Sequence, residues 1–195
     1  MNYNYLSKIA TVLQQHTNKN DLINSLSNTQ FVSKRWLIDV LAAQKLPLSP
    51  RVLILGAWYG SYLVPMLDDT IKPSHITLND KDPVVLHYAQ MLHGVDKYSY
   101  HAFDADNFAD YVDQYDVDVV INTSCEHMKD MTNLKVNNSD CVYVFQSCDN
   151  DNDPGHINTV QSTDQFIEKT GMVEVNFKGR LDLGHKNRFM VVGCK

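Results

Sequence analysis

Short runs of apolar residues alternate with amphipathic segments from residue 51 onward. The runs RVLIL and DVVIN are continuously apolar, which is typical of parallel strands that helices cover on both faces. Runs of this kind predict strands at residues 52–55, 75–78, 98–103, 117–122, 141–146, 173–177 and 189–193. Because helical patterns separate the first five strands, we expect an α/β fold with a doubly wound sheet.

The helical patterns are short, and they predict helices at residues 62–67, 83–92, 108–114 and 128–134, with a further helix at 162–169. The strand that begins at residue 173 reaches toward Leu183, so only a few residues separate it from the last strand and a tight connection must join the two. A tight connection joins antiparallel strands. The sheet is therefore expected to be mostly parallel, with an antiparallel hairpin at the C-terminal end.

The first 48 residues carry a different pattern, with apolar residues at helical spacing that include Tyr5, Ile9 and Val12. Pro47 and Pro50 end this region with a turn. We expect two or three helices that form an N-terminal cap over residues 1–48. Residues 49–195 are then the sheet domain, in one compact unit with the cap.

Composition narrows the classes of partner. The chain has 195 residues, 17 Lys and Arg against 23 Asp and Glu, and a formal net charge of −6. This balance argues against a broad basic surface for non-specific binding of nucleic acid, although it allows a small local basic patch. Since the sequence shows no separate nucleic-acid module, nucleic acid is an unlikely partner. No apolar run approaches the roughly 20 residues of a membrane span, and the N-terminus is too polar for a signal peptide.

The four cysteines form no C-x-x-C pair, which indicates free thiols in a reducing cytoplasm and no zinc ribbon. The acidic segment at residues 149–156 has the composition of a calcium loop. It places Pro154 and Val160 where such a loop needs Gly and Glu, so we expect no metal site.

Candidate binding residues lie where three successive predicted strands end. Gly56 and Gly60 follow the first strand, and Asp80 follows the second, about twenty residues after Gly60. Asp104 follows the third. For any one of these acids alone, a solvated loop residue or a helix N-cap is the better explanation. Together, at one edge of a parallel sheet, they predict a ligand site in which a carboxylate accepts both hydroxyls of a ribose.

These motifs resemble those of the class I S-adenosylmethionine-dependent methyltransferases over roughly residues 50–195. RVLILGAWYG is similar to the first motif of that family, ITLNDKDP to the second, FDADNF to the third and DVDVVINTSCEHM to the fourth. The ending NRFMVVG is similar to its last strands. The combination also resembles a poorly characterised group of small phage and microbial members.

The resemblance implies a Rossmann-like fold and S-adenosyl-L-methionine as the cofactor. It implies that the cofactor is bound by Gly56, Ala57, Trp58, Tyr59, Gly60, Asn79, Asp80, Asp104, Ala105 and Asn122.

Two positions depart from the family pattern. Ile54 stands where the family usually has an acid that helps to hold the methionine amino group, and Trp58 replaces a small residue. Trp58, Tyr59 and Tyr62 either wrap the ligand or pack in the core.

The segment from Asn122 to His127 follows the fourth strand, where the family's acceptor meets the sulfonium. We expect Asn122, Glu126 and His127 to be catalytic. His127 would act as a base where the acceptor is protonated, with Glu126 orienting it or holding the methionine amine. The alternative is that Glu126 and His127 cap the next helix and pack structurally.

A modest basic cluster surrounds the last hairpin and consists of Lys178, Arg180, His185, Lys186 and Arg188. Such a cluster is either a solvated edge that discourages strand pairing or a site for an anionic acceptor.

These features predict a cytoplasmic methyltransferase that acts on a small molecule. Other sulfonium chemistry, namely aminocarboxypropyl transfer or a lyase reaction, is the alternative within enzymes. A cofactor-binding module without turnover is the alternative from another class. A nicotinamide oxidoreductase fits less well, because Trp58 interrupts the G-x-G-x-x-G pattern. The sequence leaves the oligomeric state open.

Overall fold

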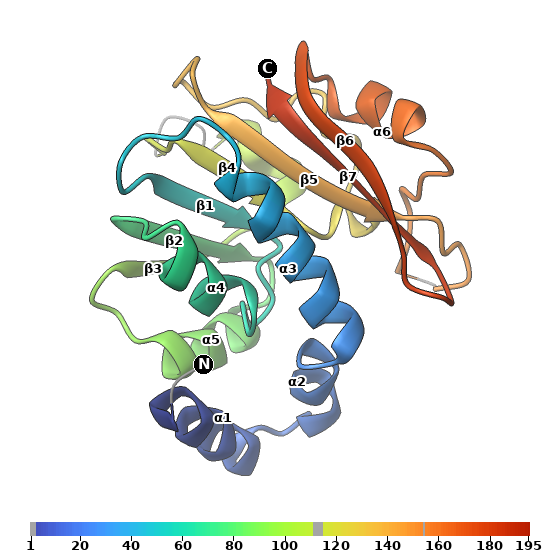
Figure 1. Cartoon of the computed structure of the whole chain (residues 1–195). Coiled ribbons are helices and arrows are strands. Elements are labelled where there is room, and N and C mark those ends of the chain that lie inside the picture. The colour runs from blue at the N-terminus through green and yellow to red at the C-terminus, as the bar shows by residue number, and fades with distance from the viewer. Residues whose placement is uncertain (1–2, 111–114, 154) are drawn as a thin grey trace.

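The computed structural model describes residues 3–110, 115–153 and 155–195. In these residues seven strands form one sheet in the order β3-β2-β1-β4-β5-β7-β6 (Figure 1). The strands are β1 (Arg51–Leu55), β2 (His75–Asp80), β3 (Tyr98–Ala102), β4 (Val119–Asn122), β5 (Val142–Cys148), β6 (Glu174–Asp182) and β7 (Asn187–Cys194). Strands β1 to β5 are parallel, whereas β7 is antiparallel to β5 and β6. The predicted fold class is confirmed.

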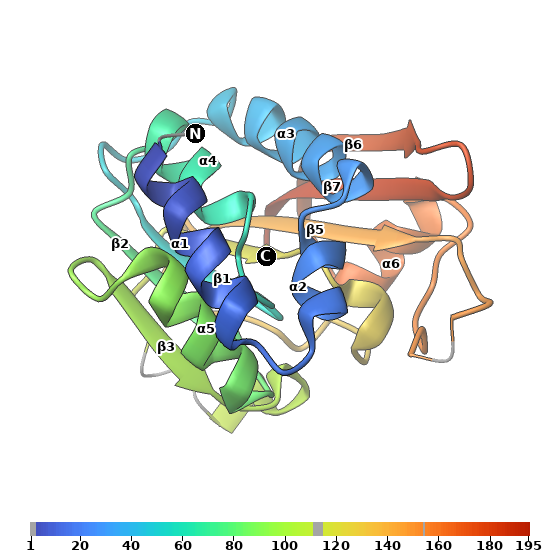
Figure 2. The ribbon, with the colours of Figure 1, turned by 90° about the horizontal axis from the view of Figure 1, so that it is seen from below.

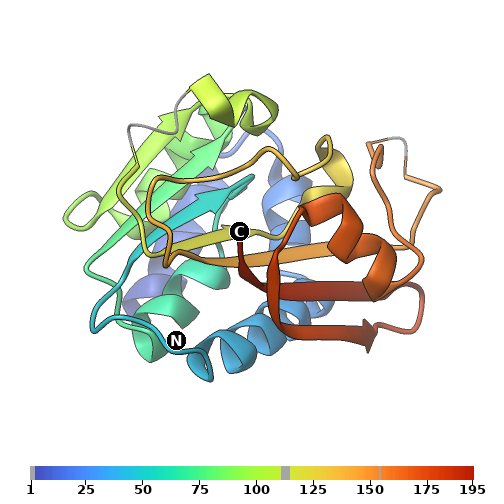
Figure 3. The same cartoon turned by 90° about the horizontal axis from the view of Figure 1, so that it is seen from above.

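The two faces of the sheet bury different sets of apolar residues. Val52 and Ile54 of β1 pack against α3 (Asn28–Ala42), α4 (Leu63–Thr70) and α5 (Pro83–His93). Leu53 and Leu55 face the opposite side, where α6 (Thr163–Thr170) contributes Phe166. Figure 3 shows α6 crossing β7 on that side. Both faces of β1 are therefore dry, which explains its uninterrupted apolar run.

The N-terminal helices are α1 (Tyr3–Gln15), α2 (Lys19–Ser25) and α3. Leu37, Ile38 and Leu41 of α3 belong to the same apolar cluster as β1, so this helix is part of the layer that covers the sheet. Helix α1 packs on α5 instead (Figure 2). The division into a cap and a domain at residue 48 stays a prediction.

One predicted helix is wrong. Residues 128–134 form bends and turns, and the preceding segment forms a short 3₁₀ helix, η3 (Cys125–His127). The backbone N–H of Lys129 donates to the Asp106 side chain, that of Met131 to the Lys169 carbonyl, and that of Thr132 to Asp130 Oδ1. Side-chain and tertiary acceptors thus take the donors that an α-helix would need.

The helix predicted at residues 108–114 falls partly on η1 (Ala105–Asp110), a 3₁₀ helix, and residues 111–114 lie outside the described residues. In the part of the chain that the structure describes, no helix is long and apolar enough to cross a membrane.

Candidate functional site

A cavity of about 540 Å³ opens where the parallel strands end. Of the residues predicted to bind or react, Gly56, Ala57, Trp58, Gly60, Asn79, Asp80, Asp104, Ala105, Glu126 and His127 line it. Two predicted residues, Tyr59 and Asn122, are buried elsewhere. The volume lies within the range of pockets that hold a small molecule or cofactor.

The turn after β1 is a strained loop that is clamped to β2. Gly56, Trp58 and Gly60 have positive φ angles of 58°, 51° and 61°. The backbone N–H of Ala57 donates to the Asn79 carbonyl at 2.7 Å, and that of Trp58 donates to Asp80 Oδ2 at 2.9 Å. Left-handed backbone at a tryptophan is costly and persists only where the surroundings hold it. Asp80 is the group that holds it.

The glycines of this turn face different surroundings. A Cβ at Gly56 would lie 2.5 Å from Met128 Cε, in the loop after β4. A Cβ at Gly60 would lie 2.7 Å from Val64 Cγ2 and 3.2 Å from Leu78 Cδ2, both in the core. Gly60 is therefore required by packing beneath the turn, although its backbone lines the cavity.

Asp80 keeps acceptor capacity for a ligand. Its Oδ1 accepts from the Asp82 N–H at 3.1 Å and its Oδ2 from Trp58, so each oxygen retains a lone pair. Burial raises the pKa of Asp80, while these two backbone N–H groups oppose that shift.

Asn79 is completely buried, and its Nδ2 donates to the carbonyls of His101 and Phe103. Among the described residues its Oδ1 has no partner, so a buried acceptor stands free beside Asp80. A buried acceptor without a donor is costly, and a ligand that donates a hydrogen bond would satisfy it.

The loop after β3 contributes Asp104, which is exposed, and Ala105, which is buried. Asp104 Oδ1 accepts from the Asp106 N–H at 3.1 Å, so its side chain stabilises its own turn. Both residues line the cavity.

Two of the three aromatic residues of the first turn contact helix α2. Trp58 Nε1 and the Tyr59 hydroxyl donate to Asp21 Oδ2 at 3.0 and 2.6 Å. Tyr59 is 1% exposed and packs in the core between α1, α2 and α5. Tyr59 therefore packs in the core and does not wrap a ligand, whereas Trp58 and Tyr62 line the cavity.

Asn122 stands behind the cavity wall. Its Nδ2 donates to Met128 Sδ at 3.0 Å and Met131 Sδ at 3.4 Å, and its Oδ1 accepts from the Ser124 N–H at 2.9 Å. The residue is 0% exposed. It fixes the turn after β4, and so it positions η3.

Glu126 pairs with Arg188, which the sequence places only in the basic cluster around the last hairpin. Its Oε1 accepts from Arg188 Nη1 of β7 at 2.5 Å, and Arg188 Nη2 donates to the Thr123 carbonyl. Burial raises the pKa of Glu126, but the charge of Arg188, the backbone N–H of Glu126 and the hydrogen bond from Arg188 together outweigh burial and leave that pKa below its usual value. In the described part of the chain, Glu126 Oε2 and Arg188 Nε are buried without a partner. The pair therefore keeps two unused polar atoms beside the cavity.

His127 lies at the exposed rim, and its Nδ1 donates to the Gly155 carbonyl at 2.9 Å. A neutral imidazole that donates from Nδ1 has its lone pair on Nε2. The ring contacts His156 edge-on, with centroids 4.6 Å apart. Since Glu126 pairs with Arg188, the orienting group of His127 is the Gly155 carbonyl.

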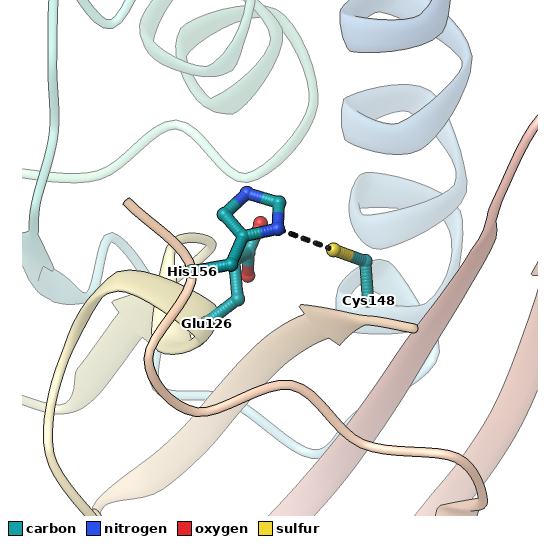
Figure 4. A group of neighbouring side chains, drawn as sticks. All are labelled: Glu126, Cys148 and His156. Atoms are coloured by element: carbon teal, nitrogen blue, oxygen red, sulfur yellow. Dashed lines mark hydrogen bonds between the residues drawn. The ribbon is translucent and has the colours of Figure 1, made fainter. Parts of the chain in front are cut away.

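Beside this pair, Glu126, Cys148 and His156 point toward one another from η3, the end of β5 and the following loop (Figure 4). One ligand atom from each lies within 4.8 Å of the others. Burial raises the pKa of Cys148, which opposes the thiolate that zinc requires. Arg188 already pairs with one oxygen of the Glu126 carboxylate and places a positive charge beside the other, so these residues fit a cation poorly.

A basic side chain from the N-terminal region completes the wall. Lys34 of α3 lines the cavity, as do Lys186 and Arg188. Burial lowers the pKa of Lys34 well below its usual value, reinforced by Arg188 and opposed by Glu126. Of the predicted basic cluster, Lys178, Arg180 and His185 are exposed and do not line this cavity.

Comparisons with known proteins place the fold. No protein-family model matches the sequence, and no curated protein matches it. Among solved structures, the complex between the Haloferax volcanii Trm112 methyltransferase activator and the putative methyltransferase matches with a TM-score of 0.63 and 15% identity, over 85% of this chain and 91% of that chain.

A putative S-adenosylmethionine-dependent methyltransferase from Listeria monocytogenes matches with a TM-score of 0.56 and 10% identity, over 83% of this chain and 99% of that chain. MtNAS in complex with MTA and tNA matches with a TM-score of 0.61 and 11% identity, over 98% and 70%. The chain has the fold of S-adenosylmethionine-dependent methyltransferases. At these identities the likeness establishes the fold alone.

Proposed function

We propose that the cavity binds S-adenosyl-L-methionine and that the protein transfers the methyl group to a small molecule. The observation that carries the proposal is the clamp between the first turn and Asp80. It sets a carboxylate with free lone pairs in the wall of the cavity, beside Asn79, whose buried Oδ1 has no partner among the described residues. A nucleoside offers the donors that these acceptors lack.

The residues present fit this cofactor. Asp80 would accept from the ribose hydroxyls, Asp104 and Ala105 would border the base, and Gly56 to Trp58 would lie along the methionine end. When bound, the cofactor supplies an electrophilic methyl group. The chain's own contribution is to position the acceptor and to exclude water, which accounts for most of the rate in such a displacement.

His127 would take a proton from the acceptor through Nε2, because its Nδ1 proton is engaged by the Gly155 carbonyl. Glu126 would hold Arg188 and η3 in place, and its free Oε2 would accept from an ammonium group such as that of methionine. Asn122 would act through the turn that it fixes. A cytoplasmic location accords with this function.

Calorimetric titration with S-adenosylhomocysteine tests the cofactor site. Asp80→Ala is expected to weaken binding by about 1–3 kcal/mol, because charge-assisted hydrogen bonds are lost. Asp69→Ala, at an exposed position on α4, is the matched control and should bind as wild type does. If folded Asp80→Ala binds S-adenosylhomocysteine with unchanged affinity, Asp80 does not contact the cofactor and the proposal is wrong.

Other sulfonium chemistry is the second candidate. It is favoured by Ile54, which occupies the place of the usual acid, and by the likeness to a structure that holds MTA. Mass spectrometry of the products separates the candidates, once acceptors are supplied. S-adenosylhomocysteine indicates methyl transfer, and methylthioadenosine indicates aminocarboxypropyl transfer or a lyase. Binding with neither product indicates a module without turnover.

A further inference from the structure

Three basic side chains from three separate elements meet at one end of the cavity. Lys34 comes from α3, Lys186 from the turn between β6 and β7, and Arg188 from β7. In the sheet, β7 is separated from β2 by β5, β4 and β1. Four strand spacings amount to roughly 19 Å. The basic end is therefore distinct from the end formed by Asp80 and Asn79.

The charges at this end do not balance. Glu126 neutralises Arg188 through their ion pair. Within the residues that the structure describes, the Lys34 and Lys186 amines form no hydrogen bond or ion pair. Asp153, the other acid in this wall, is exposed and lies 3.7 Å from His156 Nε2. Lys34 and Lys186 thus line the cavity without a hydrogen-bonded anion, and the buried Nε of Arg188 has no partner among the described residues. Glu126 acts on Lys34, and Asp153 on Lys186, only through space.

Burying an unpaired amine is unfavourable unless a partner arrives. In the wild-type fold the cost falls on Lys34, whose protonated form is disfavoured by burial and by Arg188 and Lys186, and is favoured by Glu126. An anion at this point would raise the pKa of Lys34 and so favour its ammonium form. Such a group would be bound more tightly than at an exposed lysine pair, because water screens it less.

We propose that the methyl acceptor is an anionic small molecule whose carboxylate or phosphate group is bound by Lys34, Lys186 and Arg188. The inference rests on the proposed function and names its substrate class. In the reaction, a lone pair of the acceptor forms the bond to the methyl carbon, and the electron pair of the sulfur–carbon bond stays on sulfur. Any proton that the acceptor loses passes to His127 or to water.

The test titrates two probes, glutarate and inorganic phosphate, into protein saturated with S-adenosylhomocysteine. We expect measurable binding of one or both to the wild type and a loss of at least about tenfold in Lys34→Gln and in Lys186→Gln. Lys178→Gln is the matched control, because Lys178 is exposed on β6 and pairs with Asp164 at 2.7 Å. The stronger probe tells whether the acceptor group is a carboxylate or a phosphate.

A second readout is the pH dependence of glutarate binding. Glutarate is fully ionised above pH 6.5, so its own titration does not contribute. If binding protonates Lys34 between Arg188, Lys186 and Glu126, the affinity falls as the pH rises above the pKa of Lys34 in the unliganded protein, because the proton must be supplied. This dependence should be reduced in Lys34→Gln and retained in Lys178→Gln.

Three results would overturn the inference. The first is that neither probe binds the wild type. The second is that Lys34→Gln and Lys186→Gln bind the probes as tightly as the wild type does. The third is that Lys34→Gln weakens the binding of S-adenosylhomocysteine but not that of methylthioadenosine, which would mean that the basic side chains bind the carboxylate of the cofactor. If the wild type does not bind S-adenosylhomocysteine, the proposed function is wrong. Titration of the probes into the protein without cofactor would then still test the basic site.

Discussion

The buried pair of Glu126 and Arg188 supports a quantitative prediction. Glu126 is 3% exposed and Arg188 5% exposed, and their closest atoms are 2.5 Å apart. Glu126→Gln keeps the shape of the side chain but leaves a buried guanidinium without its counter-charge. Breaking a buried pair from one side costs about 3–5 kcal/mol. Since glutamine still accepts one hydrogen bond, we expect a loss near 3 kcal/mol in the free energy of unfolding.

The assay is urea denaturation of Glu126→Gln, Arg188→Gln and the double variant. The double variant is expected to be more stable than the sum of the two single losses predicts, because it carries no uncompensated buried charge. Asp164→Asn is the matched control. It breaks the exposed pair of Lys178 and Asp164, for which we expect less than 1 kcal/mol.

The reasoning is refuted if Glu126→Gln unfolds within 1 kcal/mol of the wild type with an unchanged m-value. Binding data separate the two roles of Glu126. If its free Oε2 accepts from the methionine amine, Glu126→Gln raises the dissociation constant of S-adenosylhomocysteine while adenosine binds as before. A purely structural residue would leave both affinities unchanged in the folded fraction.

Three further predictions concern a buried histidine, a glycine of the first turn and the candidate base. Burial lowers the pKa of His93 to about 4, so the unfolded chain binds the extra proton first as the pH falls. The stability that this neutral histidine contributes is complete above pH 6.5 and falls by up to about 3 kcal/mol toward pH 4. Urea unfolding at pH 7 and pH 5 should therefore show a smaller loss of stability in His93→Gln than in the wild type. An equal loss in both proteins would contradict this prediction. Gly60→Ala should destabilise more than Gly94→Ala, because both φ angles are positive but only Gly60 is crowded; equal thermal shifts would remove the crowding argument. His127→Ala should lower turnover about 10²–10⁴-fold with little change in cofactor affinity, whereas full turnover would make His127 structural.

The sequence by itself determined which segments form strands, and that the sheet is mostly parallel with a C-terminal hairpin. Continuous apolar runs such as Val52 to Leu55 identify strands that are covered on both faces, and a short connection before β7 identifies the hairpin. The same pattern located Asp80 at the end of β2, since the carboxyl ends of parallel strands share one edge. These features depend on residues that are close together along the chain.

Only the tertiary structure decided which side chains face the cavity. Tyr59 and Trp58 are adjacent in the sequence, yet one is in the core and the other lines the cavity. The segment at residues 128–134 has a helical pattern, but acceptors on η1 and α6 take its backbone donors. Arg188 meets Glu126 across 62 positions of the chain, and Lys34 joins them from α3. The periodicity of apolar residues indicates which face of a single element is buried. Contacts between elements depend instead on how the strands and helices pack in three dimensions, which brings together residues that are far apart in the sequence.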